Sequence, residues 1–168
     1  MSTAARPRRW SERQGRWLLN LFPPLFFGGV RVLEFGPGYR TCRVRVARSL
    51  LTRNLQGTTF GGTIFSAADP FHAIMYWQVL ARRGLRVQAW LKSASVAYLK
   101  PATTALTLEF ALTDEDVESA VTALERDGRF ERSFRVEATD PTGVVCARID
   151  ALVHLRLPRG DRRGASGF

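Results

Sequence analysis

The feature that most constrains the fold is the segment 63–83, whose residues are apolar on nearly every face. A helix that is hydrophobic all round has to be buried. At 1.5 Å per residue this helix would be about 30 Å long, the full width of a small domain. Arg82, Arg83 and Gly84 close its C-terminal end. Pro70 removes one helical hydrogen bond, so we expect the helix to bend there.

The segments on either side of this helix alternate between apolar and polar residues with a period of two, which is typical of strands. A further helix is expected over 10–22, between a Ser11 N-cap and Pro23-Pro24, and another over 114–127, ended by Gly128. The order predicts an α+β domain in which an antiparallel sheet of about six strands wraps around the long central helix. The strand-like runs are 30–35, 39–46, 87–100, 104–112, 130–139 and 144–157.

The length and the charge limit the domain organisation. The 168 residues fit one domain, and 25 basic against 15 acidic side chains give a formal charge of +10. Residues 1–17 carry +4 and residues 156–168 carry +3, which leaves +3 for residues 18–155. We therefore predict a single domain over 10–157 with disordered basic tails, 1–9 and 158–168. Specific nucleic-acid binding is not expected, although an adaptor that binds nucleic acid or a membrane through these ends stays an alternative.

The predicted N-terminal helix is amphipathic, with Trp10, Trp17, Leu18 and Leu21 at helical spacing. Such a helix packs on its own domain or lies on a membrane surface. The sequence has no clean secretory signal and no uninterrupted apolar run of 18 residues, so we expect a cytoplasmic protein without a transmembrane segment.

Two cysteines, Cys42 and Cys146, are too few for a disulfide framework and have no metal-ligand spacing. Each lies in an alternating apolar run, so we expect buried free thiols.

A glycine-rich loop, Asn54 to Gly62, leads into the central helix. Gly61 and Gly62 allow a ligand to approach the backbone closely. The first N–H groups of a helix have no internal partner and carry partial positive charge. A carbonyl oxygen that gains negative charge would be stabilised there, as in an oxyanion hole.

Asp69 is the only acidic residue between Glu34 and Glu109. A carboxylate within an apolar helix is unfavourable unless it has a partner. It is therefore a candidate functional group, or else it hydrogen-bonds a loop or caps a kink at Pro70. His72, three residues further on, either pairs with Asp69 as a proton shuttle or is a core histidine, and His154 is expected to be structural. We find no nucleophile elbow and no Walker motif.

The pattern N-x-x-G-T-T-F-G-G, followed by Asp69, resembles that of the hotdog-fold thioesterases, in particular the phenylacetyl-CoA type. The residues in register are Asn54, Gly57, Phe60, Gly61, Gly62 and Asp69. The run Val96 to Ala102 is similar to the strand that follows the hotdog helix. The resemblance covers about residues 30–157. Phe60 stands where the family has histidine. In this respect the sequence resembles a less characterised branch of the family that has Phe-Gly-Gly at these positions.

This resemblance implies a site for an acyl-CoA or acyl-carrier thioester, without a metal or cofactor. Asp69 would attack the thioester or activate water, Gly62 N–H would stabilise the oxyanion, and Asn54 would hold the loop or orient the water or carbonyl. Hotdog sites usually form between two subunits, so a homodimer or homotetramer is expected. The expected substrate-binding residues are Gly57, Thr58, Phe60, Gly61, Tyr98 and Lys100, the last placed for the phosphates of CoA.

Alternatives remain open at this point. A non-catalytic acyl-CoA-binding protein is favoured by Phe60, which can pack on an acyl or pantetheine chain but cannot act as an imidazole. Hydration of enoyl thioesters is disfavoured, because hotdog hydratases carry an Asp and a His about five residues apart. Ser93 and Ser95 have no assigned role. An apolar lining for a medium or aromatic acyl chain, or simply a core, is offered by Ile64, Phe65, Phe71, Met75 and Trp77.

Overall fold

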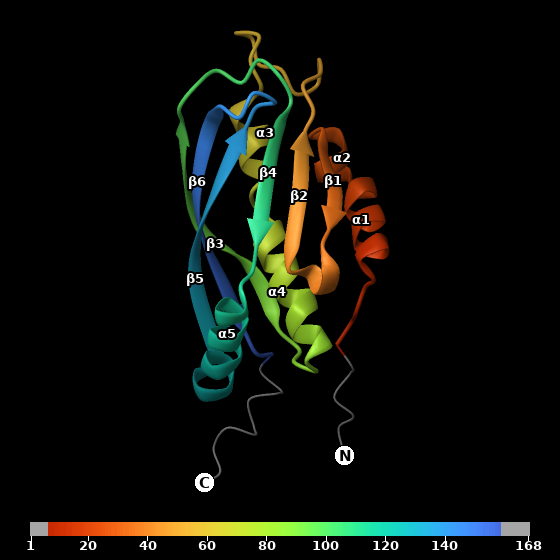
Figure 1. Cartoon of the computed structure of the whole chain (residues 1–168), viewed down its shortest axis with the longest axis vertical. Helices are drawn as coiled ribbons and strands as arrows, with labels where there is room; N and C mark the ends of the chain where they lie inside the picture. Colours follow the sequence, from red (N-terminus) through yellow and green to blue (C-terminus); the bar gives the residue numbers. More distant parts are fainter. Residues whose placement is uncertain (1–6, 159–168) are drawn as a thin grey trace.

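The sheet has six antiparallel strands in the order β1-β2-β4-β5-β6-β3 (Figure 1). It is seen in a computed structural model that describes residues 7–158. The strand order places β1 and β3 at the two edges. The strands are β1 (Val30–Phe35), β2 (Thr41–Val46), β3 (Gln88–Tyr98), β4 (Leu106–Ala111), β5 (Arg129–Thr139) and β6 (Val145–Arg156).

The period-two pattern explains which face of the sheet is buried. In β2, Cys42, Val44 and Val46 are buried while Thr41, Arg43 and Arg45 face outward. The strand-like runs 30–35 and 39–46 form a hairpin: β1 and β2 pair antiparallel, joined by the 3₁₀ turn η1 (Pro37–Tyr39), in which Gly38 has φ 63°. Both cysteines are buried free thiols, as expected.

The central helical segment is present and buried, but it is not one continuous helix. It consists of α3 (Gly61–Ser66) and α4 (Phe71–Arg82), which follow one another along one face of the sheet (Figure 1). The predicted central helical segment is therefore confirmed, but the bend expected at Pro70 is a full break between two helices. Pro70 has no N–H to continue the helical ladder, and it becomes the N-cap of α4. Asp69 consequently lies in the connection and not on a helix face.

The predicted helix over 114–127 is confirmed as α5 (Asp114–Asp127). Thr113 and Asp116 form a reciprocal capping box at its start. Gly128 ends the helix in the left-handed region, with φ 68°, where glycine is free of steric cost.

Two short helices, α1 (Glu12–Leu21) and α2 (Pro23–Phe27), lie beside β1 (Figure 1). Ser11 caps α1 as predicted. Gly15 allows α1 to approach Tyr39 closely, because a Cβ at this position would lie 2.0 Å from the Tyr39 hydroxyl. Asn20 exchanges two hydrogen bonds with the backbone of Val32. The helix therefore packs on its own domain through Gly15, Leu19 and Asn20, and not through the face that carries Trp17, Leu18 and Leu21.

The segment before α1 is tied to α4. Arg9 Nε donates to the Ala81 carbonyl at 2.9 Å, and Trp10 N–H donates to Oε1 of buried Gln78 at 2.8 Å. The tails predicted over 1–9 and 158–168 lie mostly outside the described residues. Among the helices described, none has the length and apolar character needed to cross a membrane.

Candidate functional site

The loop before α3 is held by its own hydrogen bonds. The Asn54 side-chain oxygen accepts from the N–H groups of Gln56 and Thr58, each at 3.0 Å, and its amide nitrogen donates to the Thr58 hydroxyl at 2.8 Å. These are the bonds of an Asx turn. The amide of Asn54 is thus engaged in shaping the loop, which favours the first of the two roles considered for it.

Backbone bonds fix the same loop to the rest of the domain. Thr59 N–H donates to the Ala102 carbonyl at 2.8 Å, and Phe60 N–H donates to the Thr52 carbonyl at 2.7 Å. Arg48 donates to the Gly57 carbonyl at 2.6 Å. Gly57 itself has φ 79°, a conformation that favours glycine. The loop therefore presents a defined surface to a ligand.

Side chains closely approach Gly61 and Gly62. A Cβ at Gly61 would lie 2.7 Å from the Tyr98 hydroxyl, and a Cβ at Gly62 would lie 2.5 Å from the Phe60 ring. Within residues 7–158, neither glycine amide donates a hydrogen bond to a protein acceptor. This leaves two N–H groups at the start of α3 for another acceptor.

Six of the nine predicted site residues line one groove of about 650 Å³, which we call the loop groove. Phe60 (58% exposed) and Tyr98 (56% exposed) present their rings at this groove. Thr59, which the prediction missed, also lines it, and its buried hydroxyl oxygen has no partner within the described residues. The predicted residues in the loop groove are Asn54, Thr58, Phe60, Gly61, Tyr98 and Lys100.

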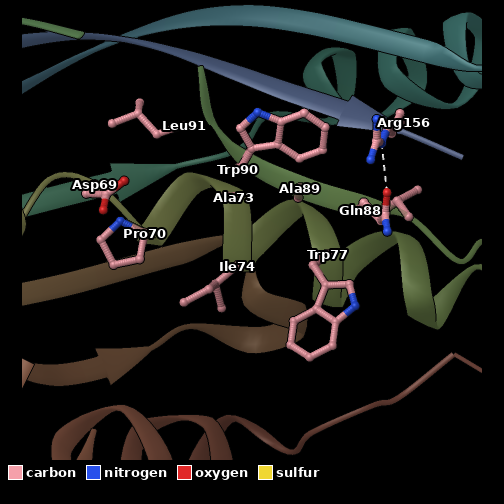
Figure 2. Close-up of a pocket in the computed structure, with 11 residues that line it drawn as sticks. Asp69, Pro70, Ala73, Ile74, Trp77, Gln88, Ala89, Trp90, Leu91 and Arg156 are labelled. Atoms are coloured by element: carbon pink, nitrogen blue, oxygen red, sulfur yellow. Dashed lines mark hydrogen bonds between the residues drawn. The ribbon is translucent and has the colours of Figure 1, made fainter. Parts of the chain in front are cut away.

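Asp69 lies in a different groove of about 600 Å³ between α4 and β3, which we call the helix groove (Figure 2). No residue lines both grooves. Within residues 7–158, the Asp69 carboxylate accepts no hydrogen bond. It remains exposed at the groove mouth, yet the partial burial raises its pKa above the usual 3.8. A carboxylate in such surroundings is a stronger base than a fully hydrated one.

The other end of the helix groove is aromatic and cationic, a feature that sequence reasoning missed (Figure 2). Arg156 lies over the Trp90 ring at 5.0 Å and donates to Gln88 at 2.7 Å. Strand pairing brings these residues together, since Gln88 is opposite Arg156 in the β3–β6 ladder. No short motif encodes such a pairing. Trp77, named as an acyl lining residue, also lines this groove.

Neither histidine pairs with Asp69 within the described chain. His72 is buried and stacks on Phe134 at a ring separation of 3.9 Å, and burial lowers its pKa to about 4. The shuttle role considered for His72 needs a contact with Asp69, and Asp69 is not among the groups that shift the pKa of His72. His154 contacts Glu131 at 2.7 Å on the outer face.

The serines and the proposed acyl lining are also placed. Ser93 and Ser95 are exposed on β3. Of the proposed acyl lining, Phe71, Met75 and Ile64 belong to the core, and Ile64 also lines the loop groove.

Solved structures with low sequence identity share this architecture. The chain is similar to PA5026 of Pseudomonas aeruginosa, a protein of unknown function, with a TM-score of 0.78 and 20% identity over 90% of this chain and 99% of that chain. The thioesterase HI1161 of Haemophilus influenzae gives a TM-score of 0.66 and 9% identity over 95% and 99%. The PaaI protein of Escherichia coli, from the phenylacetic acid degradation operon, gives 0.59 and 16% over 87% and 92%.

These similarities define the class: the chain is a hotdog-fold protein, and the predicted fold class is confirmed. A family model described as a domain of unknown function, DUF4442, matches residues 13–155. The chain belongs to this family. No curated protein sequence matches it.

Proposed function

We propose that the protein hydrolyses an acyl-CoA or acyl-carrier thioester at a site completed by a second copy of the chain. The observation that carries this proposal is Asp69, an isolated carboxylate of raised pKa at the mouth of an apolar groove. The thioesterase among the similar structures and the glycine-loop pattern support the same chemistry.

The division of the predicted residues between two grooves favours a site shared by two subunits. Asp69 of one copy would face the loop groove of its partner. Strand β3 is suited to bring the copies together, because it is an edge strand and most of its residues are exposed. An unpaired edge can pair with the same edge of a second copy. Two such dimers would make the expected homotetramer, and light scattering after gel filtration distinguishes the two assemblies by mass.

In the proposed reaction, Asp69 takes a proton from water, and the water oxygen attacks the thioester carbonyl carbon. The carbonyl electrons move to its oxygen, which the Gly62 N–H stabilises. As this intermediate collapses, the carbon–sulfur bond breaks, the acyl group leaves as a carboxylic acid, and the thiolate takes the proton from Asp69. In the other route, the Asp69 carboxylate attacks the thioester carbon and the carbon–sulfur bond breaks, which releases the thiolate and leaves an acyl–Asp69 anhydride. Water then hydrolyses this anhydride to the carboxylic acid and free Asp69. Asn54 acts as a positioning residue through the loop.

The substrate-binding roles follow from the loop groove. Phe60 packs on the acyl or pantetheine chain, and Thr58, Gly61 and Tyr98 line the path. Lys100, at the rim, attracts the phosphates of CoA. The phenyl ring in place of the family histidine supports our proposal that the chain is one of the Phe-Gly-Gly branch. A cytoplasmic location stays a prediction.

The test measures free-thiol release from a panel of acyl-CoAs by the wild type, Asp69→Asn and a control, Asp127→Asn. Asp127 is an exposed carboxylate at the end of α5, outside both grooves. We expect Asp69→Asn to lower kcat by about 10²–10⁴ and the control to match the wild type. Equal activity of all three proteins would exclude Asp69 as the base.

Acyl-CoA binding without hydrolysis is the second candidate, and the exposed Phe60 ring in the loop groove favours it. Binding of CoA esters with no thiol release by the wild type would select this candidate. Absence of both binding and release would exclude both functions.

A further inference from the structure

The apolar face of α1 and α2 is turned away from the domain. Trp17 (63% exposed), Leu18 (45%) and Leu21 (59%) lie on one side of α1, opposite buried Gly15 and Leu19. The side continues onto α2 through Phe26 and Phe27, whose rings are 5.3 Å apart. An exposed apolar patch on a soluble domain marks an interaction site. We call this surface the outer patch: Trp17, Leu18, Leu21, Phe22, Phe26 and Phe27, all at least 42% exposed.

The outer patch continues into the loop that follows β2. Leu50 and Leu51 are each 80% exposed there, and Leu55 is fully exposed. This loop adjoins the end of α2, since a Cβ at Gly29 would lie 2.6 Å from the Thr52 side chain. Figure 1 shows the loop projecting at the same end of the molecule as α2. Nine large apolar side chains therefore face solvent along one side and one end of the domain.

The positive charge of the described chain is concentrated in residues 7–60, the part of the chain that carries the outer patch and the adjoining loop. Residues 7–60 hold ten arginines against two glutamates, a net of +8, whereas residues 61–158 hold eleven basic and twelve acidic side chains, a net of −1. Arg31 lies over the Phe26 ring at 4.5 Å. Arg13 precedes Trp17 by one helical turn, and Arg48 and Arg53 flank the exposed leucines. Cationic groups thus border the apolar side chains.

We propose that the outer patch and the adjoining loop dock the protein on the surface of an anionic phospholipid bilayer. Exposed aromatic and leucine side chains enter the boundary between headgroups and acyl chains, and the bordering arginines contact lipid phosphates. An anionic membrane fits both properties of the outer patch, its exposed apolar side chains and its bordering arginines. A nucleic acid would contact the arginines but leave the apolar face uncovered. A second copy in a symmetric contact would bring two strongly positive surfaces together, which is unfavourable.

The proposal does not depend on thioester hydrolysis. It assigns a use to the N-terminal helices, which lie beside the β1 edge, whereas the proposed subunit contact lies at the β3 edge. Both surfaces can therefore be occupied at the same time.

The test is co-sedimentation of the full chain with vesicles of phosphatidylcholine alone and of phosphatidylcholine with about 30% phosphatidylglycerol. We expect binding to the anionic vesicles that weakens as salt is added, because salt screens the arginine contacts. Trp17→Ser/Phe27→Ser and, separately, Arg13→Gln/Arg53→Gln should each weaken the binding about tenfold or more.

Matched control variants carry the same chemical changes elsewhere on the molecule. Trp90→Ser/Tyr98→Ser removes two exposed aromatic side chains on β3, and Arg86→Gln/Arg129→Gln removes two exposed charges outside residues 7–60. Both should bind anionic vesicles as the wild type does. Because every substituted side chain is exposed, circular dichroism should show all four variants folded.

Several results would overturn the proposal. These are no binding to anionic vesicles, equal binding to neutral ones, or equal losses in the outer-patch variants and their controls. Light scattering after gel filtration gives the mass of each variant. A lower mass for Trp17→Ser/Phe27→Ser, with unchanged vesicle binding, would make the outer patch a contact between copies. Binding to a short DNA duplex that depends on Arg13 and Arg53, without vesicle binding, would indicate nucleic acid instead.

Discussion

At the scale of single residues, Asp69 links function to stability. Partial burial raises its folded-state pKa above 3.8, so the folded protein holds this proton more readily than the unfolded chain does. Its contribution to stability therefore falls as the pH rises from 3.8 through the folded-state pKa, and the loss is complete above that value. We predict that Asp69→Asn melts at a higher temperature than the wild type at pH 7, and that this difference disappears in acid.

Asp127→Asn is the control for that prediction, because the pKa shift of Asp127 has the opposite sign to that of Asp69. A hydrogen bond from Arg126 lowers the pKa of Asp127, so this carboxylate contributes stability above its unfolded-state pKa and loses it in acid. At pH 7, Asp127→Asn should melt at or slightly below the wild-type temperature. Thermal melts followed by circular dichroism across the pH range measure both. A lower melting temperature for Asp69→Asn at pH 7 would mean that Asp69 has a stabilising partner.

Phe60 gives a second prediction, on substrate affinity. Its ring is largely exposed in the loop groove and rests against Gly62. If it packs on the substrate, Phe60→Ala raises KM about tenfold, the effect of losing part of a buried phenyl contact, and leaves kcat within a few-fold of the wild type. Steady-state thiol release measures both constants. A fall in kcat with an unchanged KM would place the ring near the reacting atoms, and Phe60→His tests whether an imidazole raises the rate.

At the scale of elements, the break between α3 and α4 determines where Asp69 lies. Pro70→Ala restores an N–H that can bond to a carbonyl in the preceding turn, which favours a continuous helix. That change would move Asp69 out of the connecting turn. Because a misplacement of about 1 Å can lower the rate about a hundredfold, we predict a loss of that order in kcat with an unchanged or higher melting temperature. Unchanged kinetics would show that the break does not position the carboxylate.

Element boundaries were predictable wherever a local signal sets them. Ser11 and Gly128 each fix a helix end through their own backbone or side-chain geometry. The face through which α1 packs was not predictable, because it depends on Gly15 fitting beneath Tyr39, a contact distant in sequence. Most residues named from the glycine-loop motif line the loop groove. The Trp90–Arg156 end of the helix groove did not, because it arises from the register between β3 and β6.

At the scale of the whole molecule, the proposed site requires two chains. This can be tested by combining two differently inactivated variants in one dimer. Asp69→Asn removes the carboxylate, and Gly61→Val disturbs the loop groove because its side chain would overlap Tyr98. If each site combines Asp69 of one copy with the loop groove of its partner, a dimer containing one chain of each kind has one intact site and one doubly defective site.

Co-expression of the two variants with different affinity tags, followed by purification on both tags, isolates these mixed dimers. We predict that they release thiol at about half the wild-type rate per dimer, although each variant alone is nearly inactive. A site contained within one chain gives the opposite result, because each chain then keeps its own defect and the mixed dimers stay as inactive as the separate variants. Light scattering after gel filtration gives the number of chains in the purified species, and native mass spectrometry gives the ratio of the two variants.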